Sequence, residues 1–296
     1  MHIVKLSGPG GERLRADLML LTVALIWGVG FVVNRLAALQ VDALLYNGVR
    51  FMLGTLTLAP FVWRRWRGLS RLELWGGALA GVVLFAGSAF QQMGLRFTTA
   101  GKAAFITGLY VVLVPLLLAL VWRQRPHWTA WAASALAATG LFLLSAVERM
   151  ALSPGDSLEL AGALMWAFHV IIIGRLARRV DALRLALAQY AVCGLLSILA
   201  GLALEERTWG GLAAAWWAVV FTGVLSVGLA YTLQVMGQRH APPTDAAVIL
   251  SAETVFAAFS GWLVLGETLS ARQWVGCGLM LGGMILAQVR STVLKE

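Results

Sequence analysis

Residues 91–96, Gln-Gln-Met-Gly-Leu-Arg, recur as residues 234–239, Gln-Val-Met-Gly-Gln-Arg, 143 positions later in the chain. Further matches fall at the same shift, or at a shift of 139 nearer the N-terminus: Ala103-Ala104 with Ala246-Ala247, Trp131 with Trp274, Gly140 with Gly283, Trp27 with Trp166, and Val41-Asp42-Ala43-Leu44 with Val180-Asp181-Ala182-Leu183. Because these matches keep one order over nearly the whole chain, the sequence predicts two related halves, residues 1–148 and 149–296.

The composition indicates that both halves lie in a lipid bilayer. Of 296 residues, 60% are hydrophobic and 12% are charged, with a mean hydropathy of +0.81. Soluble proteins carry about 25% charged residues, and a helical span needs about 20 apolar residues. Ten apolar runs meet that length, at residues 17–37, 43–62, 73–94, 102–122, 128–147, 158–177, 182–203, 213–236, 245–265 and 272–290. The predicted fold class is an all-α integral membrane protein of ten transmembrane helices.

The distribution of basic residues predicts the orientation. The net charge is +9, but the Lys and Arg residues sit in short clusters between apolar runs, which argues against a nucleic-acid partner. With the N-terminus in the cytoplasm, the cytoplasmic segments hold fifteen Lys and Arg residues and the outer segments hold six. This positive-inside bias predicts that both termini are cytoplasmic in a multi-pass protein of the bacterial inner membrane.

Five spans in each half have a structural consequence. Because five is odd, the second half must insert upside down relative to the first. Inverted repeats around a site at the membrane midplane are a recurring design of secondary transporters. The sequence therefore predicts two inverted five-helix repeats around a central cavity that takes a small molecule. Glycines spaced four apart, Gly77/Gly81 and Gly278/Gly282, are expected to let helices approach closely.

Several stretches resemble the ten-span, EamA-type branch of the drug/metabolite transporter superfamily. In the first half these are Leu25-Ile26-Trp27-Gly28, Asn34-Arg35 and Arg50-Phe51, and in the second Glu253 with Phe256-Ala257-Ala258, then Leu265-Gly266-Glu267-Thr268-Leu269. The resemblance implies export of amino acids or related small metabolites without ATP hydrolysis. Within the superfamily, the amino-acid exporters, including the aromatic amino-acid group, are the nearest match. We therefore expect broad specificity for neutral and aromatic amino acids.

Polar side chains deep in apolar runs are the first candidates for substrate contact, because charges at that depth cost about 2.5–3.5 kcal/mol on insertion scales. Gln91 and Gln234 occupy matching positions, and their amides can donate to a carboxylate and accept from an ammonium. Tyr110 matches Glu253, which we take as the only carboxylate deep in an apolar run. Glu253 can hold a substrate ammonium or a proton, so proton coupling stays open. The alternative for the two glutamines is hydrogen bonding between helices, and the alternative for Glu253 is structural pairing with a backbone group or an Arg.

Aromatic candidates lie at the same depth. Trp27 and Trp166 match each other and can stack on a substrate side chain or cation, although many of the 13 tryptophans are expected in the interface belt. His169 lies one turn from Trp166, and Tyr231 lies three residues before Gln234, on the same helix face. Structural roles are the alternative for both.

Three further residues are expected to have gating or structural roles. Lys102 and Asp245 match near the ends of their runs, where snorkelling or a position in the first helical turn explains them. Glu267 lies at a helix end, as a cap or gate. Arg50 and Arg184 also lie close to run ends, which argues against a strongly anionic cargo.

Other functions lack sequence support. There is no phosphate loop, no H-E-x-x-H motif and no G-x-S-x-G motif, so we expect no enzyme activity, no cofactor and no metal. Cys193 and Cys277 are read as small packing residues. The four histidines are too scattered for a lipid-modifying enzyme. The alternative within transport is efflux of cationic drugs, which Glu253 and the aromatic residues would also serve.

Overall fold

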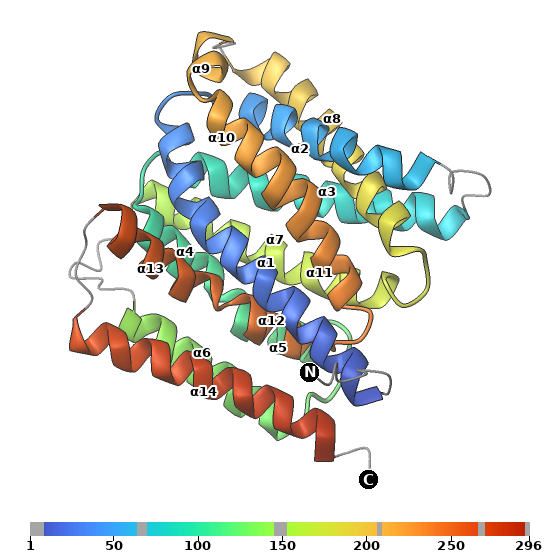
Figure 1. The fold of residues 1–296 in the computed structure, drawn as a ribbon, viewed down its shortest axis with the longest axis vertical. Helices are drawn as coiled ribbons and strands as arrows, with labels where there is room; N and C mark the ends of the chain where they lie inside the picture. The colour runs from blue at the N-terminus through green and yellow to red at the C-terminus, as the bar shows by residue number, and fades with distance from the viewer. Residues whose placement is uncertain (1–8, 64–69, 145–152, 206–208, 266–269, 294–296) are drawn as a thin grey trace, which may run out of the picture.

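The computed structural model describes residues 9–63, 70–144, 153–205, 209–265 and 270–293. Regular secondary structure in these ranges is helical throughout (Figure 1). The helices of the first half are α1 (Pro9–Ala38), α2 (Ala43–Val62), α3 (Arg71–Gly94), α4 (Ala100–Gly108), α5 (Tyr110–Leu120) and α6 (Trp128–Leu144). Those of the second half are α7 (Pro154–Leu176), α8 (Ala182–Leu204), α9 (Trp209–Ala214), α10 (Trp216–Val220), the π-helix η2 (Phe221–Tyr231), α11 (Thr232–Gly237), α12 (Pro243–Leu250), α13 (Glu253–Leu265) and α14 (Ala271–Val293).

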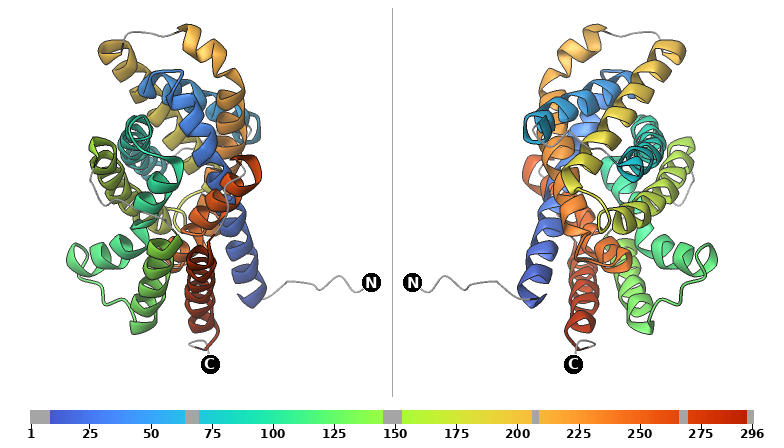
Figure 2. Two further views of the ribbon diagram at one scale, coloured as in Figure 1. Left: turned by 90° about the vertical axis from the view of Figure 1, so that its left-hand side faces the viewer. Right: turned by 90° about the vertical axis from the view of Figure 1, so that its right-hand side faces the viewer.

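Length and composition identify the helices that can cross a membrane. Among the described residues, seven helical segments are long and apolar enough, and α6 is a shorter apolar helix. Helix α2 has the length, but Asn47 and Arg50 lower its hydropathy. The all-helical membrane architecture is thus confirmed, whereas ten spans stay a prediction. The start of α1 and the end of α14 lie at the same end of the bundle (Figures 1 and 2).

Local sequence signals explain where several helices begin. At α3 and α7, Ser70 and Ser153 each accept a hydrogen bond from the backbone amide three residues on, and the acidic residue there, Glu73 or Asp156, bonds back to the serine amide. This reciprocal capping satisfies amide groups that the first turn leaves free. Asp181 caps α8 through the amides of Leu183 and Arg184.

Glycines set the closest helix contacts. Helices α6 and α14 lie side by side, and a methyl group added at Gly140 would lie 2.6 Å from the Gly276 carbonyl oxygen. Between α3 and α8, a methyl group on Gly77 would lie 2.5 Å from the Ala188 Cβ. The expectation for Gly278 and Gly282 is wrong: neither has a neighbour within 4 Å of an added methyl. The face of α14 that packs carries Gly276 and Gly283 instead.

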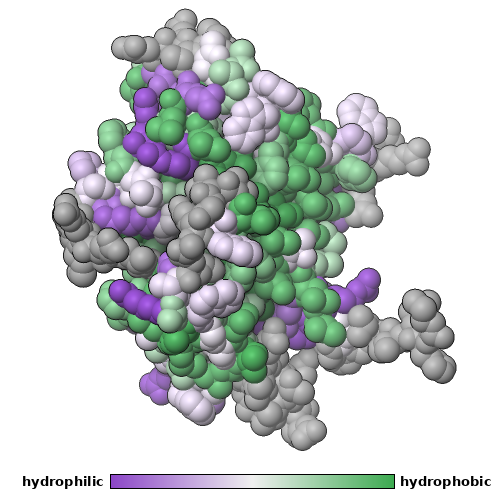
Figure 3. Space-filling view, turned by 60° about the vertical axis from the view of Figure 1, so that its left-hand side comes forward, coloured by the Kyte–Doolittle hydropathy of each residue, from purple (hydrophilic) through white to green (hydrophobic). Residues whose placement is uncertain are grey.

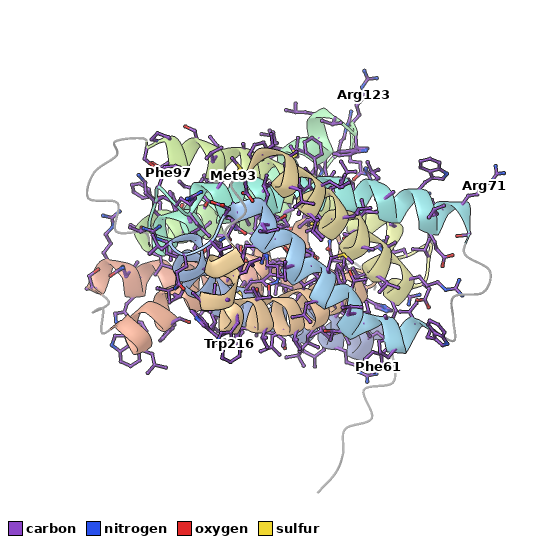
Figure 4. The ribbon with its side chains drawn as sticks, turned by 90° about the horizontal axis from the view of Figure 1, so that it is seen from above. Phe61, Arg71, Met93, Phe97, Arg123 and Trp216 are labelled. Carbon is purple, nitrogen blue, oxygen red and sulfur yellow. The ribbon has the colours of Figure 1, made fainter. Side chains whose placement is uncertain are left out.

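The outer surface is rich in apolar side chains. Phe61 is 68% exposed and Trp216 is 64% exposed, and both point away from the bundle (Figure 4). Large apolar side chains cover much of the face seen in Figure 3. Soluble monomers seldom expose apolar patches of this extent, so the surface fits a lipid environment.

Two helical rods are interrupted near their middles, at matching positions of the repeat. Helix α4 ends at Gly108 and α5 begins at Tyr110, while α12 ends at Leu250 and α13 begins at Glu253. At both breaks the backbone forms three-residue hydrogen bonds, from the Leu109 amide to Ile106 and from the Ala252 amide to Ile249. Tyr110 and Glu253 are therefore each the first residue of a new helix. Leu109 and Ser251 keep right-handed helical dihedral angles, so each break is a short tight turn within one helical segment.

Candidate functional site

A cavity lies between the two halves, next to both helix breaks. Its wall combines aromatic, polar and charged side chains from α1, α2, α3, α4, α5, α7, η2, α11, α12 and α13. Seven of the eight residues predicted to bind substrate line it: Trp27, Gln91, Tyr110, Trp166, Tyr231, Gln234 and Glu253. The repeat-matched pairs thus meet at one place from opposite halves of the chain. Their role in binding stays a prediction.

Tyr231 is the centre of the aromatic part of the cavity. Its ring centroid lies 4.6 Å from that of Trp27, and it stacks on Trp166 at 6.2 Å with 26° between the planes. It is the last residue of η2, and wide π-helical turns often mark functional sites. We call the rings of Trp27, Trp166 and Tyr231 the aromatic wall of the cavity.

His169 does not reach the cavity. It is fully buried behind the aromatic wall, edge-on to Trp166 and Tyr231 at about 6 Å. Its Nε2 atom lies 2.8 Å from Oε1 of Gln189 in α8, and its Nδ1 atom has no partner. In this geometry His169 packs against the two rings, and its predicted role in substrate binding stays a prediction.

Several polar atoms on the cavity wall lack partners. The Tyr110 hydroxyl, Gln234 Oε1 and Glu253 Oε1 are buried and have no hydrogen bond of regular geometry, although Tyr110 and Glu253 are neighbours. The Gln91 amide donates to the Thr107 hydroxyl at 3.4 Å. Buried polar groups are almost always paired. The unpartnered Gln234 Oε1 and the Tyr110–Glu253 contact both face the cavity, an arrangement that is suited to bind a polar ligand.

Arg50 is a cavity residue that sequence reasoning missed. We expected it near the end of its run, but it lies well inside α2, is 3% exposed and lines the cavity. Its guanidinium lies over the Phe51 ring at 5.0 Å, and its Nε atom donates to Asn47 at 2.9 Å. Within the described residues no carboxylate lies at ion-pair distance from it. Its position at the eighth residue of a twenty-residue run was the available signal.

A second carboxylate within a predicted apolar run is also buried, although it lies at the start of that run. Glu159 in α7 is 0% exposed, compared with 3% for Glu253. It accepts a hydrogen bond from the Thr107 hydroxyl at 3.2 Å. Glu159 lies two residues into its predicted run, where sequence position does not distinguish a helix cap from a buried group.

The residues predicted to gate lie away from the cavity. Lys102 pairs with Asp156 at 2.6 Å, which joins α4 to α7. Asp245 pairs with Arg13 at 3.0 Å, which joins α12 to α1, and Arg13 also contacts Asp17 at 3.0 Å. The matched residues thus make ion pairs at opposite ends of the bundle. Glu267 lies outside the described residues.

The arrangement can hold a small molecule that carries opposite charges. Arg50 supplies fixed donors, Glu253 supplies an acceptor, and both lie within electrostatic reach of Tyr231. The aromatic wall offers apolar surface beside them. No cluster of three or more metal-binding side chains occurs in the described part of the chain.

Comparison with known proteins agrees with this architecture. A solved crystal structure superposes with a TM-score of 0.77 at 21% identity, over 95% of this chain and 99% of that chain. An uncharacterized transporter of Archaeoglobus fulgidus is 33% identical, over 95% of this chain and 88% of the relative.

Two Escherichia coli relatives are more distant. The threonine/homoserine exporter RhtA is 28% identical, over 83% of this chain and 81% of its own length. The uncharacterized inner membrane transporter YedA is 24% identical, over 90% and 88%. The model of the EamA-like transporter family matches residues 14–146 and again residues 153–288. The chain therefore belongs to the EamA-like transporter family and is a multi-pass membrane transporter rather than an enzyme.

Proposed function

We propose that this transporter is a secondary exporter of α-amino acids, mainly neutral and aromatic ones, across the bacterial inner membrane. The observation that carries the proposal is that one cavity contains both a buried guanidinium, Arg50, and a buried carboxylate, Glu253. An amino acid is a zwitterion with a carboxylate and an ammonium on one carbon. Two opposite charges in one cavity match that pattern better than they match a cation or an anion.

Each part of the substrate has a counterpart in the cavity. Arg50 holds the carboxylate, because guanidinium donors match carboxylate geometry. Glu253 holds the ammonium, and the amides of Gln91 and Gln234 complete the polar shell. The aromatic wall contacts the side chain of the substrate and does not restrict it to one shape. Broad specificity for neutral side chains follows from this division.

Transport proceeds by alternating access between the two halves. We propose that residues 1–148 and 149–296 are inverted five-span repeats with both termini in the cytoplasm. Two observations support this. The two helix breaks fall at equivalent repeat positions, and the equivalent residues Lys102 and Asp245 make ion pairs at opposite ends of the bundle. The ion pairs Lys102–Asp156 and Arg13–Asp245 then act as outer and inner gates. Export is favoured because the relative RhtA is an exporter by name.

The second candidate is efflux of cationic compounds. The aromatic wall next to Glu253 favours it, since a desolvated cation over aromatic rings gains about 2 kcal/mol. Arg50 opposes it, because a guanidinium in the same cavity repels a cation. The sign of the effect of Arg50 removal therefore separates the two functions.

The test is counterflow of labelled amino acids in proteoliposomes at equal pH on both sides. Arg50→Gln and Glu253→Gln should each reduce phenylalanine counterflow at least tenfold. The matched control is Arg184→Gln, because Arg184 lies near a helix start and pairs with Glu73 at 3.3 Å, away from the cavity. It should stay within twofold of the unmodified protein. Undiminished counterflow by Arg50→Gln, or faster flux of a cationic dye, would refute the amino-acid site.

A further inference from the structure

Glu159 stands in an unusual environment for a carboxylate. It is completely buried between α3, α4 and α7, and its Oε1 atom has no hydrogen-bond partner. Gly94 of α3 leaves room for it, because a methyl group added there would lie 2.9 Å from Oε1. A single hydrogen bond, from Thr107, reaches the other oxygen. The Glu159 carboxylate is therefore fixed in position, but few hydrogen-bond donors compensate for the loss of its hydration.

A hydrogen-bond chain connects Glu159 to the cavity. The Gln91 amide donates to the Thr107 hydroxyl at 3.4 Å, and that hydroxyl donates to Glu159 Oε2 at 3.2 Å. Both Gln91 and Thr107 line the cavity, whereas Glu159 lies behind them. Thr107 is thus a single hydroxyl shared by the cavity and the buried carboxylate.

The other side of Glu159 leads toward one face of the bundle. Asp156 lies one helical turn earlier, is 1% exposed, and accepts from Thr98 at 3.0 Å and from Lys102 at 2.6 Å. Lys102 is partly exposed, with a side-chain exposure of 24%. Asp156 and Lys102 are thus charged groups on this side of Glu159, and the Arg35 guanidinium donates to the Leu95 carbonyl next to Gly94. The groups that face it from α3 and α4, at Gly94 and Thr107, are neutral.

The repeat provides an internal comparison for this position. A shift of 143 places Gly94 on Gly237 and Thr107 on Leu250, and a shift of 139 places Leu20 on Glu159. In the structure Gly237 indeed packs on Leu20, and a methyl group added there would lie 3.0 Å from the Leu20 Cγ. The same helix contact is therefore made with a leucine in one half and a carboxylate in the other. Packing alone does not require a carboxylate.

We propose that Glu159 is the proton-binding residue that couples substrate export to proton entry, an inference that rests on the proposed amino-acid function. The Thr107 hydroxyl has one proton, which it can donate toward Glu159 or toward the cavity. When a substrate N–H donates to the Thr107 oxygen, the hydroxyl donates to Glu159, which favours the carboxylate. When Glu159 is protonated, it donates to Thr107, whose hydroxyl proton then points into the cavity and meets the substrate donor.

This arrangement makes the two sites compete. Substrate in the cavity favours release of the proton from Glu159, and a proton on Glu159 weakens substrate binding by the same factor, because coupling between two sites is reciprocal. Competition of this kind produces exchange of one substrate for one proton. The proton would be taken up from water at the face that carries Asp156 and Lys102.

The experiment uses the full-length protein in proteoliposomes, with the membrane potential clamped at zero. Phenylalanine counterflow at equal pH measures exchange, and accumulation driven by a pH difference measures coupling. One proton per substrate supports about tenfold accumulation per pH unit. Glu159→Leu, which copies Leu20, should retain counterflow within threefold and lose gradient-driven accumulation. Glu159→Gln, whose neutral amide can donate to Thr107 as the protonated carboxyl does, should raise the half-saturation concentration for phenylalanine and also lose gradient-driven accumulation. The control Glu73→Gln, at the opposite end of the bundle, should retain both.

The outcomes separate the two claims. The coupling role would be overturned if the wild-type protein shows counterflow and Glu159→Leu accumulates phenylalanine along the pH difference as strongly as the wild-type protein does. It would also be overturned if the wild-type protein shows counterflow at equal pH but no accumulation driven by a pH difference. That result would leave the proposed amino-acid function intact. Absence of wild-type counterflow with every amino acid tested would overturn the proposed function and this inference with it.

Discussion

Tyr231 at the end of η2 packs on Trp27 of α1, with 4.6 Å between their ring centroids. The contact joins one residue from each half of the chain inside the cavity. Trp166, the repeat counterpart of Trp27, stacks on Tyr231 with 6.2 Å between the ring centroids. The aromatic wall is thus built around one tyrosine, and its loss should affect both tryptophans.

Tyr231→Ala is expected to weaken amino-acid binding, because it removes the ring on which Trp27 and Trp166 pack. Truncation of a large buried aromatic also costs about 3–5 kcal/mol of folding stability. Tyr231→Phe retains the ring and should keep transport within about threefold. The half-saturation concentration for phenylalanine counterflow, measured for both variants, checks this. Equal effects of the two substitutions would show that the hydroxyl, and not the ring, matters.

Gly140→Ala and Gly278→Ala should differ in stability. The added methyl at position 140 meets the Gly276 carbonyl oxygen at 2.6 Å, whereas position 278 faces open space. Overpacking costs about 1–3 kcal/mol, while alanine in a helix is favoured over glycine by about 0.5–1 kcal/mol. Thermal unfolding in detergent should show a lower melting temperature for Gly140→Ala and an unchanged or higher one for Gly278→Ala. A destabilised Gly278→Ala would contradict the observed face of α14.

Asp245→Asn is expected to change transport rate without changing substrate affinity. Asp245 holds Arg13 across α1 and α12 at 3.0 Å and does not line the cavity. Equilibrium binding of phenylalanine should stay within twofold, and the counterflow rate should change at least threefold because the proposed inner gate is weakened. The control is Glu12→Gln at the same end, where Glu12 is 62% exposed and meets His240 at 3.5 Å. Exposed pairs contribute little, so this variant should transport normally.

The architecture was largely predictable because the bilayer imposes strong constraints on sequence. Unsatisfied backbone groups are excluded from lipid, so long apolar runs must be helices. The repeat then aligned Gln91 with Gln234 and Tyr110 with Glu253, and the structure places all four on one cavity wall. Residues matched by the repeat therefore share both their depth along the helix and the helix face that meets the cavity.

The unpredicted features depend on helix faces and exact depth. Hydropathy does not distinguish Gly276, which packs, from Gly278, which does not. Arg50 was placed near the end of its run although it is the eighth of twenty residues, and Glu159 was not singled out because its place at the start of a run does not show burial. The break at Leu109 follows Gly108, a residue that weakens helices, but glycine is too frequent in this chain, with 32 residues, to mark the break from sequence.

The most direct test of the amino-acid site is competition for phenylalanine counterflow by analogues that lack one charge. In the proposed site, phenylalanine presents a carboxylate to Arg50 and an ammonium to Glu253. Phenethylamine lacks the carboxylate, and 3-phenylpropionate lacks the ammonium. We expect unlabelled phenylalanine to compete at least tenfold better than either analogue, and Arg50→Gln to abolish its advantage over phenethylamine. If phenethylamine competes as well as phenylalanine in the unmodified protein, the cavity recognises cations and the zwitterion account is wrong.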